Sequence, residues 1–159
     1  MAKKIMTTLL VLAAGFLLIQ LVPYGRDHMN PAVVSEPKWD TPQTLELAKR
    51  ACFDCHSNNT TWPWYSNIAP ISWLIQKDVD EGRDVINFSE WNSAGAGQSN
   101  RRRNEAQAVR DVVLEGRMPP SQYLILHPNA SLSQAEAKQL AQGLQDSLGV
   151  IPNLVSDKQ

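Results

Sequence analysis

The chain contains only two cysteines, which lie three positions apart, and a histidine follows the second: Cys52, Cys55 and His56. On a helical turn, residues at i, i+3 and i+4 share one face. Two thiols and an imidazole can therefore address one flat object, with the thiols on the two haem vinyl groups and the imidazole on the iron. This C-x-x-C-H spacing is typical of c-type haem attachment. We predict one covalent haem c whose iron is held by His56.

Other uses of the cysteine pair explain less. A zinc site needs two more ligands, and the remaining histidines, His28 and His127, form no second paired half-site. A thioredoxin-like pair belongs in a βαβ setting, and the sequence shows no alternating strand pattern. A plain disulfide leaves His56 without a role.

The N-terminus carries a long apolar run. Lys3 and Lys4 precede residues 5–22, which contain no charge. As a helix this run spans about 27 Å, just enough for a bilayer core. No small-x-small cleavage site follows it, so an uncleaved anchor is favoured over a signal peptide. The two lysines place the N-terminus in the cytoplasm and the rest of the chain outside.

The length suits one domain after this segment. We divide the chain into a membrane anchor or signal peptide (1–22), a proline-containing extended tether (23–38), a haem-binding domain (39–150) and a C-terminal tail (151–159). The formal net charge of −1 gives no basic face for nucleic acid.

Start and stop signals predict an all-α domain. A helix should begin at Thr41 and Pro42, a good N-cap followed by a good first residue. Residues 57–70 read as loop, residues 71–81 as a helix that stops at Gly82, and residues 92–104, including Arg101–Arg103, as a surface loop. A further helix runs from Ala106 to Gly116.

The last helix has a full start signal. Ser133 and Glu136 form a capping box, and the apolar face continues from Ala137 to Leu148 before Gly149 ends the helix.

Several motifs after the cysteine pair occur in a recognisable order: Trp62-Pro63-Trp64-Tyr65-Ser66, Ile68-Ala69-Pro70, Gly82-Arg83, Trp91, Gly116-Arg117-Met118-Pro119-Pro120 and Tyr123. Over residues 25–149 the chain resembles the bacterial haem-binding domain family of small cytochrome c-like proteins. The resemblance implies a compact fold like that of class I cytochromes c, one covalent haem and usually an N-terminal membrane segment. It implies no electron partner and no enzymatic reaction.

Three residues could be the sixth iron ligand: Met118, His127 and His28. Met118 lies before two prolines that force an extended loop, and this loop resembles the Met-Pro ligand loop of class I cytochromes c. A lone methionine is more often core filling, but this setting favours ligation. His127 is the runner-up, and His28, in the tether, should be solvated.

Large aromatic side chains should wall the haem pocket. We expect Trp62, Trp64, Tyr65 and Trp73 to contact the macrocycle, and one of their polar hydrogens to bond a propionate. A ligating histidine donates its other ring N–H to a fixed acceptor. Pro70 is the expected carbonyl acceptor, with Pro63 second.

These features favour a single-haem electron carrier over an enzyme. A His/Met iron raises the reduction potential and suits electron transfer. The alternatives are a haem-based small-ligand sensor or a peroxidase-like enzyme, although the sequence places no distal His–Arg pair. We expect a single pass through a bacterial inner membrane, the domain in the periplasm, and a redox protein as partner.

Overall fold

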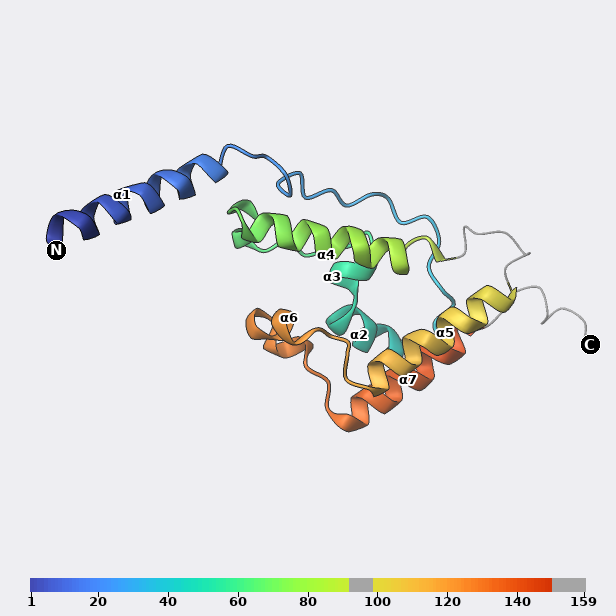
Figure 1. Cartoon of the computed structure of the whole chain (residues 1–159). Coiled ribbons are helices and arrows are strands. Elements are labelled where there is room, and N and C mark those ends of the chain that lie inside the picture. Colours follow the sequence, from blue (N-terminus) through green and yellow to red (C-terminus); the bar gives the residue numbers. More distant parts are fainter. Residues whose placement is uncertain (92–98, 150–159) are drawn as a thin grey trace, which may run out of the picture.

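The computed structural model describes residues 1–91 and 99–149, and this part of the chain is all-helical, as predicted. Figure 1 shows the helices in chain order: α1 Ala2–Ile19, α2 Pro42–Ala51, α3 Phe53–His56, the 3-10 helix η1 Trp64–Asn67, α4 Ile71–Val85, α5 Ser99–Leu114, α6 Ser121–Leu126, the 3-10 helix η4 Pro128–Ala130 and α7 Gln134–Gly149. The predicted tail at 151–159 lies outside the described residues.

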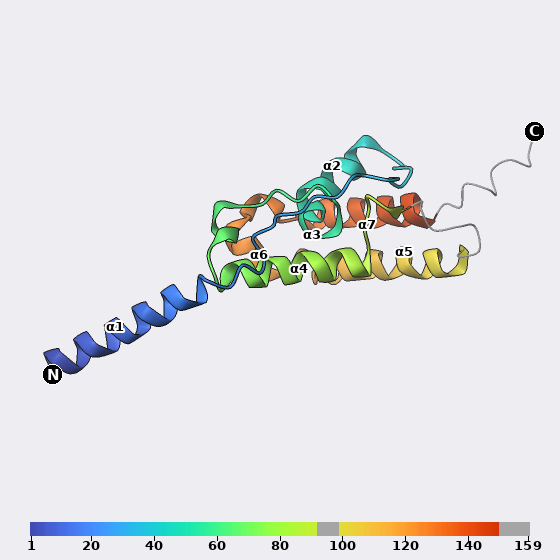
Figure 2. The same cartoon turned by 90° about the horizontal axis from the view of Figure 1, so that it is seen from above.

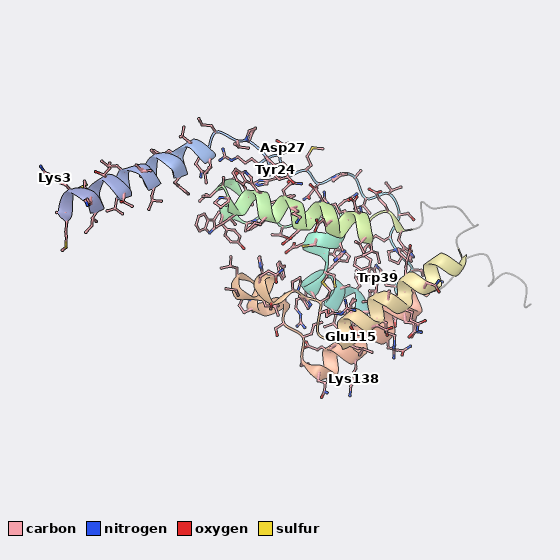
Figure 3. All side chains as sticks on the ribbon, viewed as in Figure 1. Lys3, Tyr24, Asp27, Trp39, Glu115 and Lys138 are labelled. Atoms are coloured by element: carbon pink, nitrogen blue, oxygen red, sulfur yellow. The ribbon has the colours of Figure 1, made fainter. Side chains whose placement is uncertain are left out.

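Helix α1 stands apart from the rest of the molecule (Figure 1). None of its side chains is buried, and by length and composition it could cross a membrane. Figure 3 shows its side chains projecting into open space, with Lys3 near its free end. Contact of α1 with lipid instead of water would account for these exposed apolar side chains.

The core lies between α2, α5 and α7. Helices α5 and α7 run side by side in both views (Figures 1 and 2), and α2 packs on α7. Their facing side chains are almost fully buried: Leu47, Ala48, Ala106, Val113, Leu140, Leu144 and Leu148. Next to this layer the rings of Trp39, Phe53 and Phe88 have centroids 5.5–6.0 Å apart. This aromatic cluster holds α3 against the core.

Helix α2 begins as predicted. Thr41 is its N-cap, with its hydroxyl accepting the backbone N–H of Thr44 at 3.1 Å, and Pro42 occupies the first turn. The helix ends at Ala51, and its C-cap residue, Cys52, has a backbone that departs from helical values. The N–H groups of Cys55 and His56 both donate to the Cys52 carbonyl, so the motif forms its own helical turn. The predicted one-turn geometry is confirmed, although it is not a continuation of α2.

Helix α4 is longer than predicted. We placed its end at Gly82, but the helix continues to Val85. Gly82 serves a packing role instead, because a Cβ there would lie 2.4 Å from the Cys55 carbonyl oxygen. The absence of a side chain lets α4 approach α3 backbone to backbone.

Helix α5 starts earlier than predicted. Residues 99–104 were expected in a surface loop, but they form the first turns of the helix. The backbone of Arg101–Arg103 is helical, and arginine has a high helix propensity. The predicted loop at 92–98 lies outside the described residues.

The segment between α1 and α2 is extended but not free. The Arg83 guanidinium donates to the carbonyls of Met29 and Ser57, and Asn58 donates to the carbonyl of Ala32. His28, predicted to be solvated, is half-buried: its ring stacks on Trp62 at 4.8 Å, and its Nε2 lies 2.8 Å from the Ser66 hydroxyl. The prediction for His28 was therefore wrong. Polar side chains distant in the sequence therefore donate hydrogen bonds to backbone carbonyls of the segment between α1 and α2.

The capping box of α7 is present as predicted. The Ser133 N–H donates to a Glu136 carboxylate oxygen at 2.8 Å, the Glu136 N–H donates to the Ser133 hydroxyl, and Arg50 pairs with Glu136 at 2.6 Å. These hydrogen bonds, with the Ser133 backbone N–H first, lower the pKa of Glu136 to about 2.

This lowered pKa predicts a pH-dependent contribution to stability. The stabilisation by the Glu136 carboxylate is fully present above the ordinary glutamate pKa of 4.5, and it is lost as the pH falls toward about 2. In urea unfolding in detergent, the wild type should therefore lose its advantage over Glu136→Gln as the pH falls through that range. Glu46→Gln, which removes an exposed carboxylate from α2, is the control. An equal difference at pH 6 and pH 2.5 would contradict the expectation.

Candidate functional site

A cavity of about 330 Å³ opens beside the α3 turn. Cys52, Cys55 and His56 line one wall, α4 supplies Val85, and Met118 belongs to the segment before α6. Two smaller cavities share parts of this wall. One of about 160 Å³ is lined by Cys52, His56 and Met118 and reaches the apolar face of α5. The other, of about 210 Å³, is lined by Cys55 and His127 and reaches α6.

Both cysteines are free thiols. Burial, followed by the neighbouring Cys55, raises the pKa of Cys52 to about 12. Burial, followed by the charge of Asp78, raises the pKa of Cys55 to about 11. At neutral pH both sulfurs therefore keep their protons, and neither thiol is the thiolate that metal binding or disulfide exchange requires.

His56 is held by the helix opposite. Its Nδ1 lies 2.8 Å from the Gly82 carbonyl oxygen and 3.2 Å from that of Ile86. A carbonyl only accepts, so Nδ1 carries the proton and Nε2 keeps its lone pair. Burial lowers the pKa of His56, and the two carbonyl acceptors oppose that shift. The ring is thus a neutral, oriented imidazole.

The acceptor predicted for His56 was wrong. The Pro70 carbonyl accepts the N–H groups of Trp73 and Leu74 in the first turn of α4, and the Pro63 carbonyl accepts from Ser66. Both carbonyls are therefore engaged by the helices that follow them. Gly82 is the acceptor because its missing side chain brings α4 against α3.

Met118 shares two cavities with His56, whereas His127 shares neither of them. Gly116, with φ +67°, turns the chain after α5 and leads into Met118. Both ring nitrogens of His127 have partners, the Tyr65 hydroxyl at Nε2 (3.3 Å) and the Tyr123 carbonyl at Nδ1 (3.1 Å). The geometry therefore favours Met118 as the residue that faces the same space as His56.

Sequence reasoning missed Asp54, the residue inside the cysteine motif. Its carboxylate accepts the Tyr123 hydroxyl at 2.6 Å and the Thr61 N–H at 2.9 Å. The Tyr123 ring stacks on His127 with centroids 4.0 Å apart. Burial, followed by the Asp54 hydrogen bond and charge, raises the pKa of Tyr123, which stays protonated. Asp54 thus ties α6 to the turn that carries the cysteines, and only the contact itself could have revealed this.

The predicted aromatic residues divide into two groups. Tyr65 lines the cavity of about 210 Å³, which His127 also lines. Trp62 stacks on His28 and donates to Asn30, Trp64 is 77% exposed, and Trp73 has a buried indole N–H without a hydrogen-bond partner. None of the three tryptophans lines any of these cavities. In the cavity of about 160 Å³, the apolar lining includes Val109, Val112 and Val113 of α5.

The haem-binding domain family profile matches residues 14–146, which is most of the chain. The chain belongs to the haem-binding domain family. Comparisons with curated proteins and with solved structures gave no match. As a family member, the protein binds haem.

The residues around the cavities fit haem. A haem site needs a mostly apolar cleft with a few placed polar groups, and valines of α5 together with Phe88 line the cavity of about 160 Å³. A neutral imidazole with its second nitrogen bonded to a carbonyl is the usual state of a metal-binding histidine. Two thiols and a thioether border the same space. These features make the α3 turn and the cavities around it the candidate haem site.

Proposed function

We propose that Cys52 and Cys55 hold one haem covalently, as in c-type cytochromes. The proposal rests on the observation that both free thiols and the His56 imidazole border one cavity. In attachment, each S–H adds across one vinyl double bond. The sulfur bonds to one vinyl carbon, the other takes the proton, and the vinyl π bond is lost, so no oxidant is needed. The raised thiol pKa values favour thiols that stay reduced until attachment.

His56 and Met118 are the proposed axial ligands. Supporting this, His56 Nε2 keeps its lone pair while Nδ1 is bonded to Gly82. Met118 borders the same two cavities as His56. Bound haem iron would supply one-electron redox chemistry. The protein would orient the imidazole, supply the soft thioether that favours the reduced iron, and keep water away with the α5 valines.

The proposed role is electron transfer at the outer face of a membrane. Helix α1 would anchor the chain, and Lys3 and Lys4 before it favour a cytoplasmic N-terminus. The domain would then face the periplasm of a bacterial cell and exchange electrons with a redox protein. On this proposal the protein is a carrier and not an enzyme.

A second candidate function draws on the polar groups near Cys55. A hydrogen-bonded cluster lines the cavity of about 210 Å³ and consists of Asp54, Tyr65, Tyr123 and His127. Acid–base groups of this kind suit a peroxidase-like enzyme or a small-ligand sensor with an open iron position. Carbon monoxide binding by the reduced protein separates the two proposals, because it requires an open or labile sixth position.

Mass spectrometry tests the covalent attachment. Full-length protein made with the cytochrome c maturation machinery should keep one haem after denaturation, so its mass should exceed that of the bare chain by one haem. Cys52→Ser and Cys55→Ser should each leave at most one thioether bond, and the double variant should lose all haem on denaturation. A wild-type mass equal to that of the bare chain with a Cys52–Cys55 disulfide would contradict the proposal.

A further inference from the structure

The end of the domain next to α1 carries an exposed apolar surface. Its members are large side chains from η1, the start of α4 and α6: Trp64, Ile71, Leu74, Ile125 and Leu126, with exposed fractions between 41% and 77%. We call this set the apolar end surface. Ile71, Leu74 and Leu126 lie together around one cavity, and Trp64 meets Tyr65 of the same cavity with ring centroids 5.7 Å apart. Trp64 and Ile125 are the chain neighbours of Tyr65 and Leu126, which both line this cavity, so the five side chains gather around it.

Charged side chains are missing from the segments that build this surface. Residues 57–76 and 118–135 contain no aspartate, glutamate, lysine or arginine. The charged residues that line the shared cavity, Asp54 and Asp78, come from outside these segments. A patch in contact with water normally mixes apolar and charged residues. Aromatic residues beside aliphatic ones, without charge, are typical of protein at a membrane–water interface.

The apolar end surface is fixed to the end of α1. The Gln20 side chain makes two hydrogen bonds with the Ala69 backbone: its Nε2 donates to the carbonyl at 2.9 Å, and its Oε1 accepts the N–H at 3.0 Å. Arg26 donates to the same Gln20 oxygen at 3.0 Å. Because Ala69 comes two residues before α4, the domain cannot turn freely about the helix.

The length of α1 sets the depth of this junction. Eighteen helical residues cover about 27 Å, slightly less than a hydrocarbon core of about 30 Å. If α1 crosses the bilayer, Gln20 must lie at the lipid headgroups, and Ala69 with it. Figures 1 and 2 both show α6 and the start of α4 at the end of the domain nearest α1. Figure 3 shows Tyr24 in the chain just after α1, beside the start of α4.

From this geometry we propose that the apolar end surface lies in the headgroup region of the same bilayer that α1 crosses. The inference rests on the membrane anchor proposed above and adds a second contact with lipid. It also places the cavity that Leu74 and Leu126 line next to the membrane. Contact with lipid removes apolar area from water that the isolated domain leaves exposed.

Photocrosslinking in the full-length protein tests the surface. The photoreactive residue p-benzoylphenylalanine replaces Trp64 or Ile125, each 77% exposed, in protein reconstituted into phosphatidylethanolamine–phosphatidylglycerol nanodiscs. Matched controls replace Leu12 in α1 (64% exposed) and Val34 (65% exposed). Val34 is hydrogen-bonded to Ser89, beyond the far end of α4. After irradiation, mass spectrometry counts lipid adducts at each position.

We expect lipid adducts at Trp64, Ile125 and Leu12, and only background at Val34. Adducts at Leu12 alone would overturn the inference and leave the anchor in place, while adducts at none of the positions would overturn both. In native membranes, a protein adduct at Ile125 in place of lipid would overturn lipid as the occupant. The haem spectrum of each sample reports on haem attachment independently.

Discussion

Replacement of Gly82 by alanine is expected to separate α3 from α4 and to disturb the proposed iron ligand. The added Cβ would lie 2.4 Å from the Cys55 carbonyl oxygen and 2.9 Å from the Cys55 Cβ. Both contacts are with backbone or the first side-chain atom, so no flexible group can move aside. Overpacking of this kind costs about 3 kcal/mol at its upper end. The better helix propensity of alanine recovers about 1 kcal/mol, which leaves a net loss of about 2 kcal/mol.

The same substitution should affect His56. Its Nδ1 hydrogen bond to the Gly82 carbonyl is 2.8 Å long and would lengthen as the two helices separate. Such a bond keeps a metal-binding imidazole oriented and basic. The reduction potential should therefore change together with stability, a combination that damage confined to the core would not produce.

Urea unfolding in detergent and a redox titration measure the two effects of Gly82→Ala. Gly149→Ala is the matched control, since an added Cβ there meets no atom of the described residues within 4 Å, and that glycine is the last residue of α7. Equal stability and equal potential in both variants would show that α4 tolerates a side chain at this contact and that the close approach has no role.

Local sequence signals predicted the helix ends that depend on neighbouring residues. Thr41 with Pro42, and Ser133 with Glu136, act through hydrogen bonds within a single turn, so the residues themselves contain the information. Gly82 failed as a stop signal because its role depends on Cys55, which only the packing of α3 on α4 places beside it. A glycine required by tertiary contact has the same local appearance as one that ends a helix.

The site shows the same division. The C-x-x-C-H spacing predicted a shared face for Cys52, Cys55 and His56, and these residues border one cavity together with Met118. Their roles toward haem stay predictions. The Asp54–Tyr123 hydrogen bond joins residues far apart in the chain, and no periodicity links them. The tryptophans were expected at the haem pocket because they are large and flat and follow soon after the cysteine motif. Trp62 donates to Asn30 and borders none of the cavities around the motif. The cytochrome c-like arrangement stays a prediction.

Replacement of Met118 by alanine should open the proposed sixth coordination position while the covalent haem stays attached. The thioether borders both cavities that contain His56, and alanine cannot reach the iron from the same backbone position. Loss of the soft ligand should lower the reduction potential on the order of 0.2 V, within the wide range that axial ligands set. The reduced variant should also bind carbon monoxide, which the wild type should resist.

Two further variants identify the ligand. Met29→Ala removes a methionine that is 65% exposed in the segment between α1 and α2, and it should leave the potential and carbon monoxide binding unchanged. His127→Ala breaks the contact with Tyr65 and should also leave the iron closed. The oxidised wild type should show the weak red-edge Met–iron charge-transfer band, which Met118→Ala should lose. If His127→Ala opens the iron instead, the ligand pair is bis-His and the carrier works at a lower potential. If the wild type already binds carbon monoxide, the position is open from the start, and the acid–base cluster around Asp54 becomes the place to look for chemistry.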